Sequence, residues 1–197
     1  MLPAATFPDA HSKDNALQPS QHETVLFLCT GNYYRSRFAE IFFNWHAKKF
    51  NLPWRAESRG LRLDAANSGY MSRYTISRLG RMEIPVAEYL RYPQDLTLND
   101  LSSVQHIVAV KATEHRPLMT TRFPEWLDKV EFWEVHDIDC SDPEEALPHL
   151  EQEVKGLMQR LTEGLKPSDT SDASVTRVVP QPGFVARRAQ TTQYEVR

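Results

Sequence analysis

The stretch Val25-Leu26-Phe27-Leu28-Cys29-Thr30-Gly31-Asn32-Tyr33-Tyr34-Arg35-Ser36 decides the fold of this chain. Its first five residues form a continuous apolar run, which is typical of a strand buried on both faces of a parallel sheet. Beyond it, large apolar residues recur at positions 38, 41, 42 and 45, and this spacing predicts an amphipathic helix over residues 36–50. The stretch therefore predicts a strand, a tight loop and a helix in direct succession.

The loop has the residues of a binding site for a tetrahedral oxyanion. Backbone N–H groups of such a loop converge on phosphate, and the N-terminus of the following helix adds partial positive charge. Arg35 offers a bidentate fork to two phosphate oxygens, while Gly31 and Asn32 tolerate the positive φ angles of a tight cradle or of an ordinary turn. The same positive field favours the thiolate of Cys29, which is the nucleophilic form. The loop predicts phosphoryl transfer onto sulfur without a metal.

The rest of the chain alternates between strand and helix patterns. Strands are predicted over residues 25–29, 53–58, 104–110 and 130–135. Helices are predicted over residues 36–50 and 71–82, and over 113–127 with interruptions at Pro117 and Pro124. A last helix is predicted for an apolar stripe of Leu147, Leu150, Val154, Leu157 and Leu161. This alternation predicts one α/β domain with a four-stranded parallel twisted sheet, helices on both faces and the phosphate-binding loop after the first strand. Ligands of such sheets bind beyond the carboxyl ends of the strands.

Composition sets further limits on the class of protein. A chain of 197 residues, 41% of them apolar, suits one domain with tails, and we expect a disordered leader at 1–22, a folded domain at 23–166 and a flexible tail at 167–197. The net charge of −3 gives no pull toward nucleic acid or membrane, and no apolar run approaches the roughly 20 residues of a membrane span. The two cysteines, Cys29 and Cys140, exclude a disulfide framework and indicate a reducing cytoplasm.

The segment CTGNYYRSRFAE, residues 29–40, resembles the phosphate loop of the low-molecular-weight protein tyrosine phosphatase family, whose usual form is C-x-G-N-x-C-R-S-P-x-A-E. Ser58-Arg59-Gly60 is similar to the Ser-Ala-Gly segment that follows the second strand of that family, and the order of elements fits over residues 23–165. The resemblance implies a cofactor-free hydrolase that acts on phosphorylated protein, phosphotyrosine above all, or on small phosphomonoesters. We further expect a monomer or weak dimer, with no nucleic-acid or membrane partner.

The resemblance also implies the role of each loop residue. Cys29 is the expected nucleophile, which forms a phosphocysteine, and Arg35 binds the phosphate and stabilises its equatorial oxygens. Ser36 is expected to bond the Cys29 sulfur, although a helix N-cap would also explain a serine there. Asn32 is expected to be structural and held by Ser58. The other expected phosphate-binding residues are Thr30, Gly31, Tyr33 and Tyr34.

Two aspartates compete for the role of general acid, which protonates the departing oxygen. Asp137 follows the last apolar residue of the fourth strand by two positions, as the family's acid does. Asp142 precedes Pro143 and so matches the family's Asp-Pro dipeptide, but Asp-Pro-Glu-Glu also reads as a helix start. We favour Asp137, with Asp142 as the alternative and Asp139 a distant third.

Several features leave alternatives open. Tyr34 replaces the family's second loop cysteine, and Ile138 and Asp139 stand where an aromatic pair usually grips the phosphotyrosine ring. A thiol-dependent arsenate reductase would need a disulfide relay, for which only Cys140 is available besides Cys29. A phosphate-binding module without turnover and a phosphoarginine phosphatase are further alternatives. Glu114 either lines the cleft or belongs to a polar first helical turn.

No metal site is expected. His136, Asp137, Asp139, Cys140 and His149 lack the spacing of zinc ligands, and the segment has no glycine where a calcium loop needs one.

Overall fold

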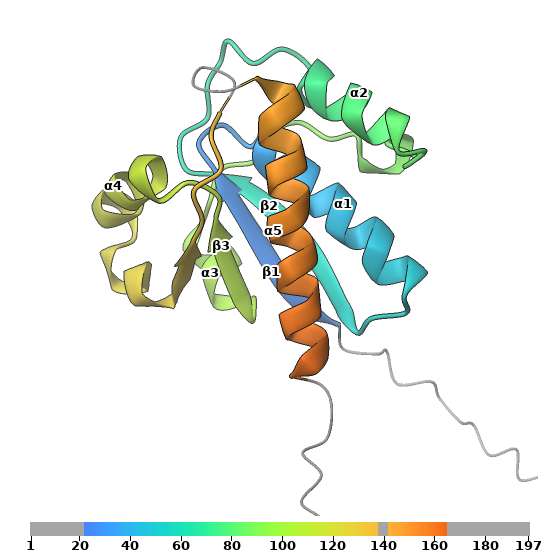
Figure 1. Ribbon diagram of the computed structural model, residues 1–197. Coiled ribbons are helices and arrows are strands. Elements are labelled where there is room, and N and C mark those ends of the chain that lie inside the picture. Colours follow the sequence, from blue (N-terminus) through green and yellow to red (C-terminus); the bar gives the residue numbers. More distant parts are fainter. Residues whose placement is uncertain (1–21, 138–141, 165–197) are drawn as a thin grey trace, which may run out of the picture. The chain divides into compact units, whose positions relative to one another are not determined.

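The computed structural model describes residues 22–137 and 142–164, and Figure 1 shows their arrangement. The strands are β1 (Glu23–Cys29), β2 (Trp54–Gly60), β3 (His106–Ala109) and β4 (Val130–Phe132). They form one sheet in the order β2-β1-β3-β4, and every neighbouring pair is parallel. The four-stranded parallel α/β sheet expected from the sequence is confirmed.

Helices cover both faces of this sheet. Val25 and Phe27 of β1 pack in one core with residues of α1 (Arg35–Lys49) and α5 (Pro143–Glu163), which lie together on one face (Figure 1). The alternate residues, Leu26 and Leu28, pack in a second core with residues of α3 (Leu98–Ser102) and α4 (Ala112–Arg122). Side chains of a strand alternate between faces, so β1 is apolar throughout because both its faces are covered.

The topology places Cys29 at a switch point of the sheet. β1 pairs with β2 on one side and with β3 on the other, and the helices that follow β1 and β3 pack on opposite faces. The loops after these two strands therefore diverge and leave a crevice beyond their carboxyl ends. Cys29 is the last residue of β1 and so lies at the floor of this crevice.

Several element boundaries differ from those expected. The interruption predicted at Pro124 is present, since α4 ends at Arg122 and a 3-10 helix, η2 (Pro124–Lys129), follows, because a proline has no N–H with which to continue an α-helix. The interruption predicted at Pro117 is wrong, because Pro117 lies inside α4. The predicted strand 130–135 ends at Phe132, after which Glu134 makes one isolated bridge to Lys111. The interpretation of Ser36 as an N-cap is wrong, because α1 begins one residue earlier and its N-cap is Tyr34.

Short elements complete the described chain. α2 (Arg73–Arg81) has Ser72 as its N-cap, whose hydroxyl accepts from the N–H of Tyr74, and η1 (Ala87–Tyr89) follows α2. Both η1 and α3 were missed in the sequence because helices of three and five residues carry too few apolar positions to show a period.

Within the described residues, no helix has the length and apolar character needed to cross a bilayer. The predicted tail lies outside the described residues, as does all of the leader except His22, so the domain division stays a prediction.

Replacement of Phe27 by alanine is expected to destabilise the fold strongly. Phe27 is fully buried, and its ring lies 6.0 Å from that of Phe43 and 5.8 Å from that of Trp133. The Phe27→Ala variant should lose about 3–5 kcal/mol of unfolding free energy in urea titration, since truncation leaves a cavity. Phe50→Ala, at a ring that is 61% exposed, is the matched control and should change stability by less than about 1 kcal/mol. Similar losses in both variants would contradict the placement of Phe27 in the core.

Candidate active site

The loop between β1 and α1 forms the floor of a cavity of about 360 Å³. The cavity is lined by Cys29, Thr30, Gly31, Tyr33, Tyr34, Arg62, Asp64, Asn67, Ser72, Glu114 and Asp137. α1 begins at Arg35, directly after the loop, so its unpaired N–H groups and its dipole add positive charge to this end of the sheet. The structure thus brings most of the predicted loop residues and one of the predicted acids to a single cavity.

The guanidinium of Arg35 lies behind the wall of this cavity and is only 1% exposed. Nη1 donates to the carbonyl oxygen of Val135 at 3.1 Å, and Nη2 donates to Glu114 Oε2 at 2.9 Å and also to Asp137. Burial opposes the charge, but the sulfur of Cys29 and the carboxylates of Asp137 and Glu114 raise the pKa of Arg35 above its usual value. Nε is buried and has no partner in the structure, so it is a free donor for an oxyanion.

A chain of hydrogen bonds from Asn32 through Ser36 reaches the sulfur of Cys29. Ser36 Oγ lies 2.9 Å from Cys29 Sγ, and Asn32 Nδ2 donates to the same hydroxyl oxygen at 3.1 Å. Because Asn32 is the donor to Ser36, the hydroxyl proton of Ser36 is available to the sulfur. Such a donor stabilises a thiolate and improves it as a leaving group.

Asn32 adopts a left-handed conformation, with φ of 49°, that turns the loop around the site. Its side chain is fully buried and fully bonded: Nδ2 also donates to Ser58 Oγ at 2.8 Å, and Oδ1 accepts from Arg91 Nη1 and the Gln94 N–H at 2.9 Å each. These bonds compensate the strain that a positive φ imposes on a residue with a side chain. The predicted contact between Asn32 and Ser58 is present.

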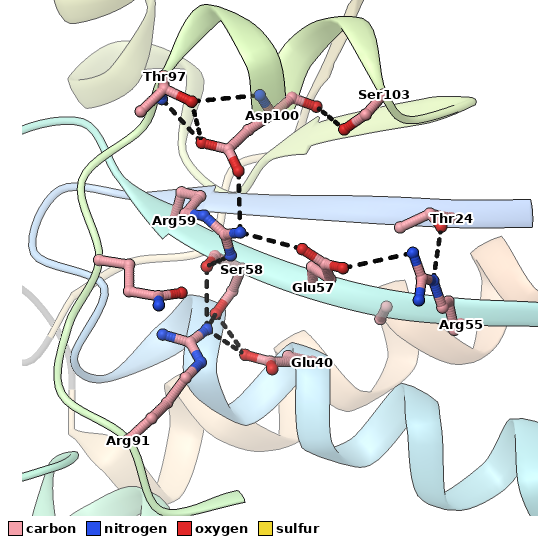
Figure 2. A network of polar contacts seen from close by, with 12 residues as sticks. Thr24, Glu40, Arg55, Glu57, Ser58, Arg59, Arg91, Thr97, Asp100 and Ser103 are labelled. Carbon is pink, nitrogen blue, oxygen red and sulfur yellow. Dashed lines mark hydrogen bonds and ion pairs between the residues drawn. The ribbon is translucent and has the colours of Figure 1, made fainter.

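Arg91 joins this network from the segment after η1, as Figure 2 shows beneath the end of β2. Its Nη2 donates to Glu40 Oε2 at 2.9 Å and to Ser58 Oγ at 3.0 Å, and Ser58 Oγ donates to the same Glu40 oxygen at 2.5 Å. Burial lowers the pKa of Arg91, and the carboxylate of Glu40 opposes that shift. Arg91 and Glu40 therefore form a partly buried ion pair that holds Asn32 in place. A lone arginine in a loop carried no signal that the sequence analysis could have used.

The end of β2 approaches the loop closely because Gly60 has no side chain. A Cβ atom at Gly60 would lie 3.0 Å from the carbonyl oxygen of Thr30 and 3.1 Å from the nitrogen of Asn32. The backbone after it is bonded to the loop, since Leu61 N donates to Cys29 O and Arg62 N donates to Thr30 O. The Ser-x-Gly segment is thus explained by the contacts of both residues with the loop.

Glu114 lines the cavity and also belongs to the first turn of α4, so both alternatives for this residue hold. It accepts hydrogen bonds from Thr30 Oγ1 and from Arg35, and so joins α4 to both ends of the loop. Burial alone would raise the pKa of Glu114, but the imidazole of His115, 3.7 Å away, the Arg35 guanidinium and the Thr30 hydroxyl hold it well below its usual range. The burial of His115 in turn lowers the pKa of its imidazole.

The structure separates the two candidate acids. Asp137 lines the cavity and accepts a hydrogen bond from Arg35 Nη2. Asp142 is the N-cap of α5, its carboxylate accepts from the N–H of Glu144 at 2.8 Å, and Pro143 follows at the first helical position. The helix-start reading of Asp142 is confirmed. Asp139, Ile138 and Cys140 lie outside the described residues, so the ideas that rest on them stay predictions.

The mouth of the cavity is polar. Arg62, Asp64, Asn67 and Ser72, from the segment after β2, line it, and the sequence analysis assigned none of them to the site. The phenol of Tyr33 donates to the carbonyl oxygen of Ser68 at 2.6 Å, which ties the loop to that segment. Residues of an irregular connection have no period or motif, so only the folded chain brings them to the site.

Comparison with known proteins assigns the chain to a class. Residues 24–167 match the family model of the low molecular weight phosphotyrosine protein phosphatases, so the chain belongs to this family and is a phosphatase. A low molecular weight protein tyrosine phosphatase from T. tengcongensis is 26% identical, with a TM-score of 0.59 over 73% of this chain and 99% of its own. A search of curated proteins finds no significant relative.

Two further solved structures share the fold. YfkJ from Bacillus subtilis is 21% identical, with a TM-score of 0.64 over 73% of this chain and 97% of its own. The YwlE arginine phosphatase from Geobacillus stearothermophilus is 23% identical, with a TM-score of 0.55 over 73% of this chain and 92% of its own. The family resemblance read from residues 29–40 is thereby confirmed.

Glu114 should make the stability of the protein depend on pH. Its pKa is lowered on folding from an unfolded value near 4.5, so the stability it contributes is present above that pH and is lost as the pH falls below it. The Glu114→Gln variant should be less stable than wild type by about 1–2 kcal/mol at pH 7 in urea titration, and the gap should narrow at pH 4. Glu125→Gln, at an exposed side chain, is the control and should show no such gap. A Glu114→Gln gap that is equal at both pH values would contradict this assignment.

Proposed function

We propose that the protein hydrolyses phosphomonoesters of phosphorylated protein, phosphotyrosine above all, through a phosphocysteine on Cys29. One observation carries the proposal. The fully buried Arg35 keeps its Nε donor without a partner while Cys29, whose sulfur is held by Ser36, lines the adjoining cavity. A buried cation with a free donor beside a nucleophilic sulfur suits a phosphate dianion.

In the first step, the thiolate of Cys29 attacks phosphorus in line with the leaving oxygen. The S–P bond forms, the P–O bond to the leaving group breaks, and its electron pair goes to the leaving oxygen. Asp137, which lines the cavity and contacts Arg35, transfers its proton to that oxygen. Arg35 and the loop N–H groups stabilise the charge on the equatorial oxygens.

In the second step, water hydrolyses the phosphocysteine. Asp137, now a carboxylate, takes a proton from the water as its oxygen attacks phosphorus. The S–P bond breaks, its electron pair returns to the sulfur, and inorganic phosphate leaves. The hydroxyl of Ser36, 2.9 Å from the sulfur, stabilises the thiolate that departs.

Replacement of the proposed nucleophile and acid should separate their roles. Cys29→Ser is expected to abolish turnover of p-nitrophenyl phosphate, and Asp137→Asn should lower kcat by about 10²–10⁴-fold on a phosphate ester with a poor leaving group. Asp142→Asn is the matched control, since it removes the charge of the other candidate but keeps an N-cap, and it should retain near-wild-type kcat. An unchanged kcat in Asp137→Asn together with a strongly lowered kcat in Asp142→Asn would refute the assignment of Asp137 as the general acid.

The substrate class is tested with peptides that differ only in the phosphorylated residue. Steady-state kinetics on matched phosphotyrosine, phosphoserine and phosphoarginine peptides should give the highest kcat/KM for phosphotyrosine, because Tyr33 and Tyr34 line the cavity and an aromatic ring stacks favourably against aromatic walls. A preference for phosphoarginine would instead indicate that the carboxylates of Asp64 and Glu114 select a cationic leaving group. Phosphate binding by wild type without hydrolysis of any peptide would refute the enzymatic proposal.

A further inference from the structure

Two exposed tyrosine rings lie against each other beside the cavity. Tyr70 precedes α2, Tyr92 follows η1, and their ring centroids are 4.8 Å apart. Tyr70 is 43% exposed and Tyr92 is 66% exposed, so the pair presents an aromatic surface to solvent. Single exposed apolar side chains are common on proteins, but two rings that different segments bring together form a surface that a partner can bury.

Exposed apolar side chains gather on the two segments that carry this pair. Among the described residues, four of the seven large apolar side chains that are exposed belong to residues 61–72 and 90–94. These four are Leu63, Tyr70, Leu90 and Tyr92. Both segments are irregular connections on the surface, where binding residues are often found.

The segment that carries Tyr70 spans the length of Tyr33, a residue that lines the cavity. The phenol of Tyr33 donates to the carbonyl oxygen of Ser68 at 2.6 Å, and the backbone oxygen of Tyr33 accepts from the N–H of Ser72 at 2.9 Å. Tyr70 is the middle residue between these two contacts. Because Asn67 and Ser72, on either side of it, line the cavity, Tyr70 lies at the rim.

The segment that carries Tyr92 is bonded to the same loop. Arg91 Nη1 and the N–H of Gln94 each donate to Asn32 Oδ1 at 2.9 Å. Tyr92 lies between these two donors, and its own carbonyl oxygen accepts from Arg91 Nη1 at 3.3 Å. Asn32 directly precedes Tyr33, so the segments that carry the two rings are fixed to adjacent residues of the loop. The pair therefore has a set position at the rim before substrate binds.

A polypeptide substrate must place some of its residues at this rim. The cavity, with a volume of about 360 Å³, has room for one phosphorylated side chain, so the residues next to a phosphotyrosine lie outside it. An apolar side chain that leaves water to pack on the tyrosine pair gains binding free energy. The gain is retained because the two rings already contact each other and lose little conformational freedom on binding.

We propose that the Tyr70–Tyr92 pair is a docking surface for apolar residues that flank phosphotyrosine in a protein substrate, an inference that rests on the proposed function. The phosphorylated side chain enters the cavity toward Cys29, and an apolar neighbour in the polypeptide packs on the two rings. This contact lies outside the reacting atoms and is the same before and during the chemical step. It therefore lowers KM and leaves kcat unaffected.

The proposal is tested by Tyr92→Ala with three substrates: a phosphotyrosine peptide with leucine on both sides, the same peptide with serine on both sides, and p-nitrophenyl phosphate. Wild type should have a kcat/KM at least about fivefold higher on the leucine peptide than on the serine peptide. Tyr92→Ala should raise KM on the leucine peptide about fivefold to tenfold, with kcat changed less than about twofold. On the other two substrates kcat/KM should change less than about twofold, since neither has an apolar flanking side chain.

Two further variants sharpen the test. Tyr70→Ala should raise KM on the leucine peptide in the same way, and the double variant should lose less than the product of the two single effects, because the rings form one surface. Phe50→Ala is the matched control, since its ring is 61% exposed but follows α1 at the end opposite to the phosphate loop. It should leave kcat/KM unchanged on all three substrates.

The outcomes separate this inference from the proposed function. Equal losses on the leucine peptide and on p-nitrophenyl phosphate would mean that the pair supports the loop rather than the substrate. A wild-type enzyme that does not distinguish the two peptides, or a Tyr92→Ala variant with wild-type KM, would mean that nothing docks on the pair. Each of these results overturns the inference while the phosphatase reaction stands. Absence of turnover by wild type on all three substrates would overturn the proposed function, and the inference with it.

Discussion

The structure around the cavity depends on one buried cation, Arg35. Arg35 follows β1 and is 1% exposed. Its guanidinium binds the segments that follow two other strands: Glu114 after β3, and Val135 and Asp137 after β4. A buried charge is tolerated only where it is paired and hydrogen-bonded, so the fold supplies two carboxylates and a carbonyl oxygen. The same groups direct the guanidinium toward the phosphate loop. One requirement thus accounts for both the packing at this edge of the sheet and the proposed chemistry.

A second, partly buried cation also supports the loop. Arg91 pairs with Glu40 and donates to Asn32, which donates to Ser58. Asn32 also donates to Ser36, the residue whose hydroxyl contacts the Cys29 sulfur. Figure 2 shows Arg91, Glu40 and Ser58 beside the polar contacts that run along β2, including the ion pair of Arg59 with Asp100. The loop is therefore fixed by charged groups on both sides, which keeps its donors oriented before substrate binds. Preorganised donors stabilise a transition state without the cost of reorganisation.

Charge also shapes the mouth of the cavity. Glu114, Asp137 and Asp64 place carboxylates around a site for an anion, with Arg62 as the cation among the residues that line its mouth. Glu114 accepts hydrogen bonds from Arg35 and Thr30, and Asp137 accepts one from Arg35, so the same guanidinium compensates much of the charge of both carboxylates.

The sequence by itself determined the sheet, the loop and the family. The apolar run of β1 indicates a strand that is buried on both faces. The spacing of Cys29, Gly31, Asn32 and Arg35 indicates a loop that curls around an oxyanion. Both features could be predicted because each depends on contiguous residues alone. Asp137 was predicted for the same reason, from its place at the end of a strand. Only the tertiary structure decided that Arg91, Glu114, Arg62, Asp64, Asn67 and Ser72 join the site. Such contacts join residues up to about 100 positions apart, and they depend on how strand ends and loops meet, which no short-range pattern encodes.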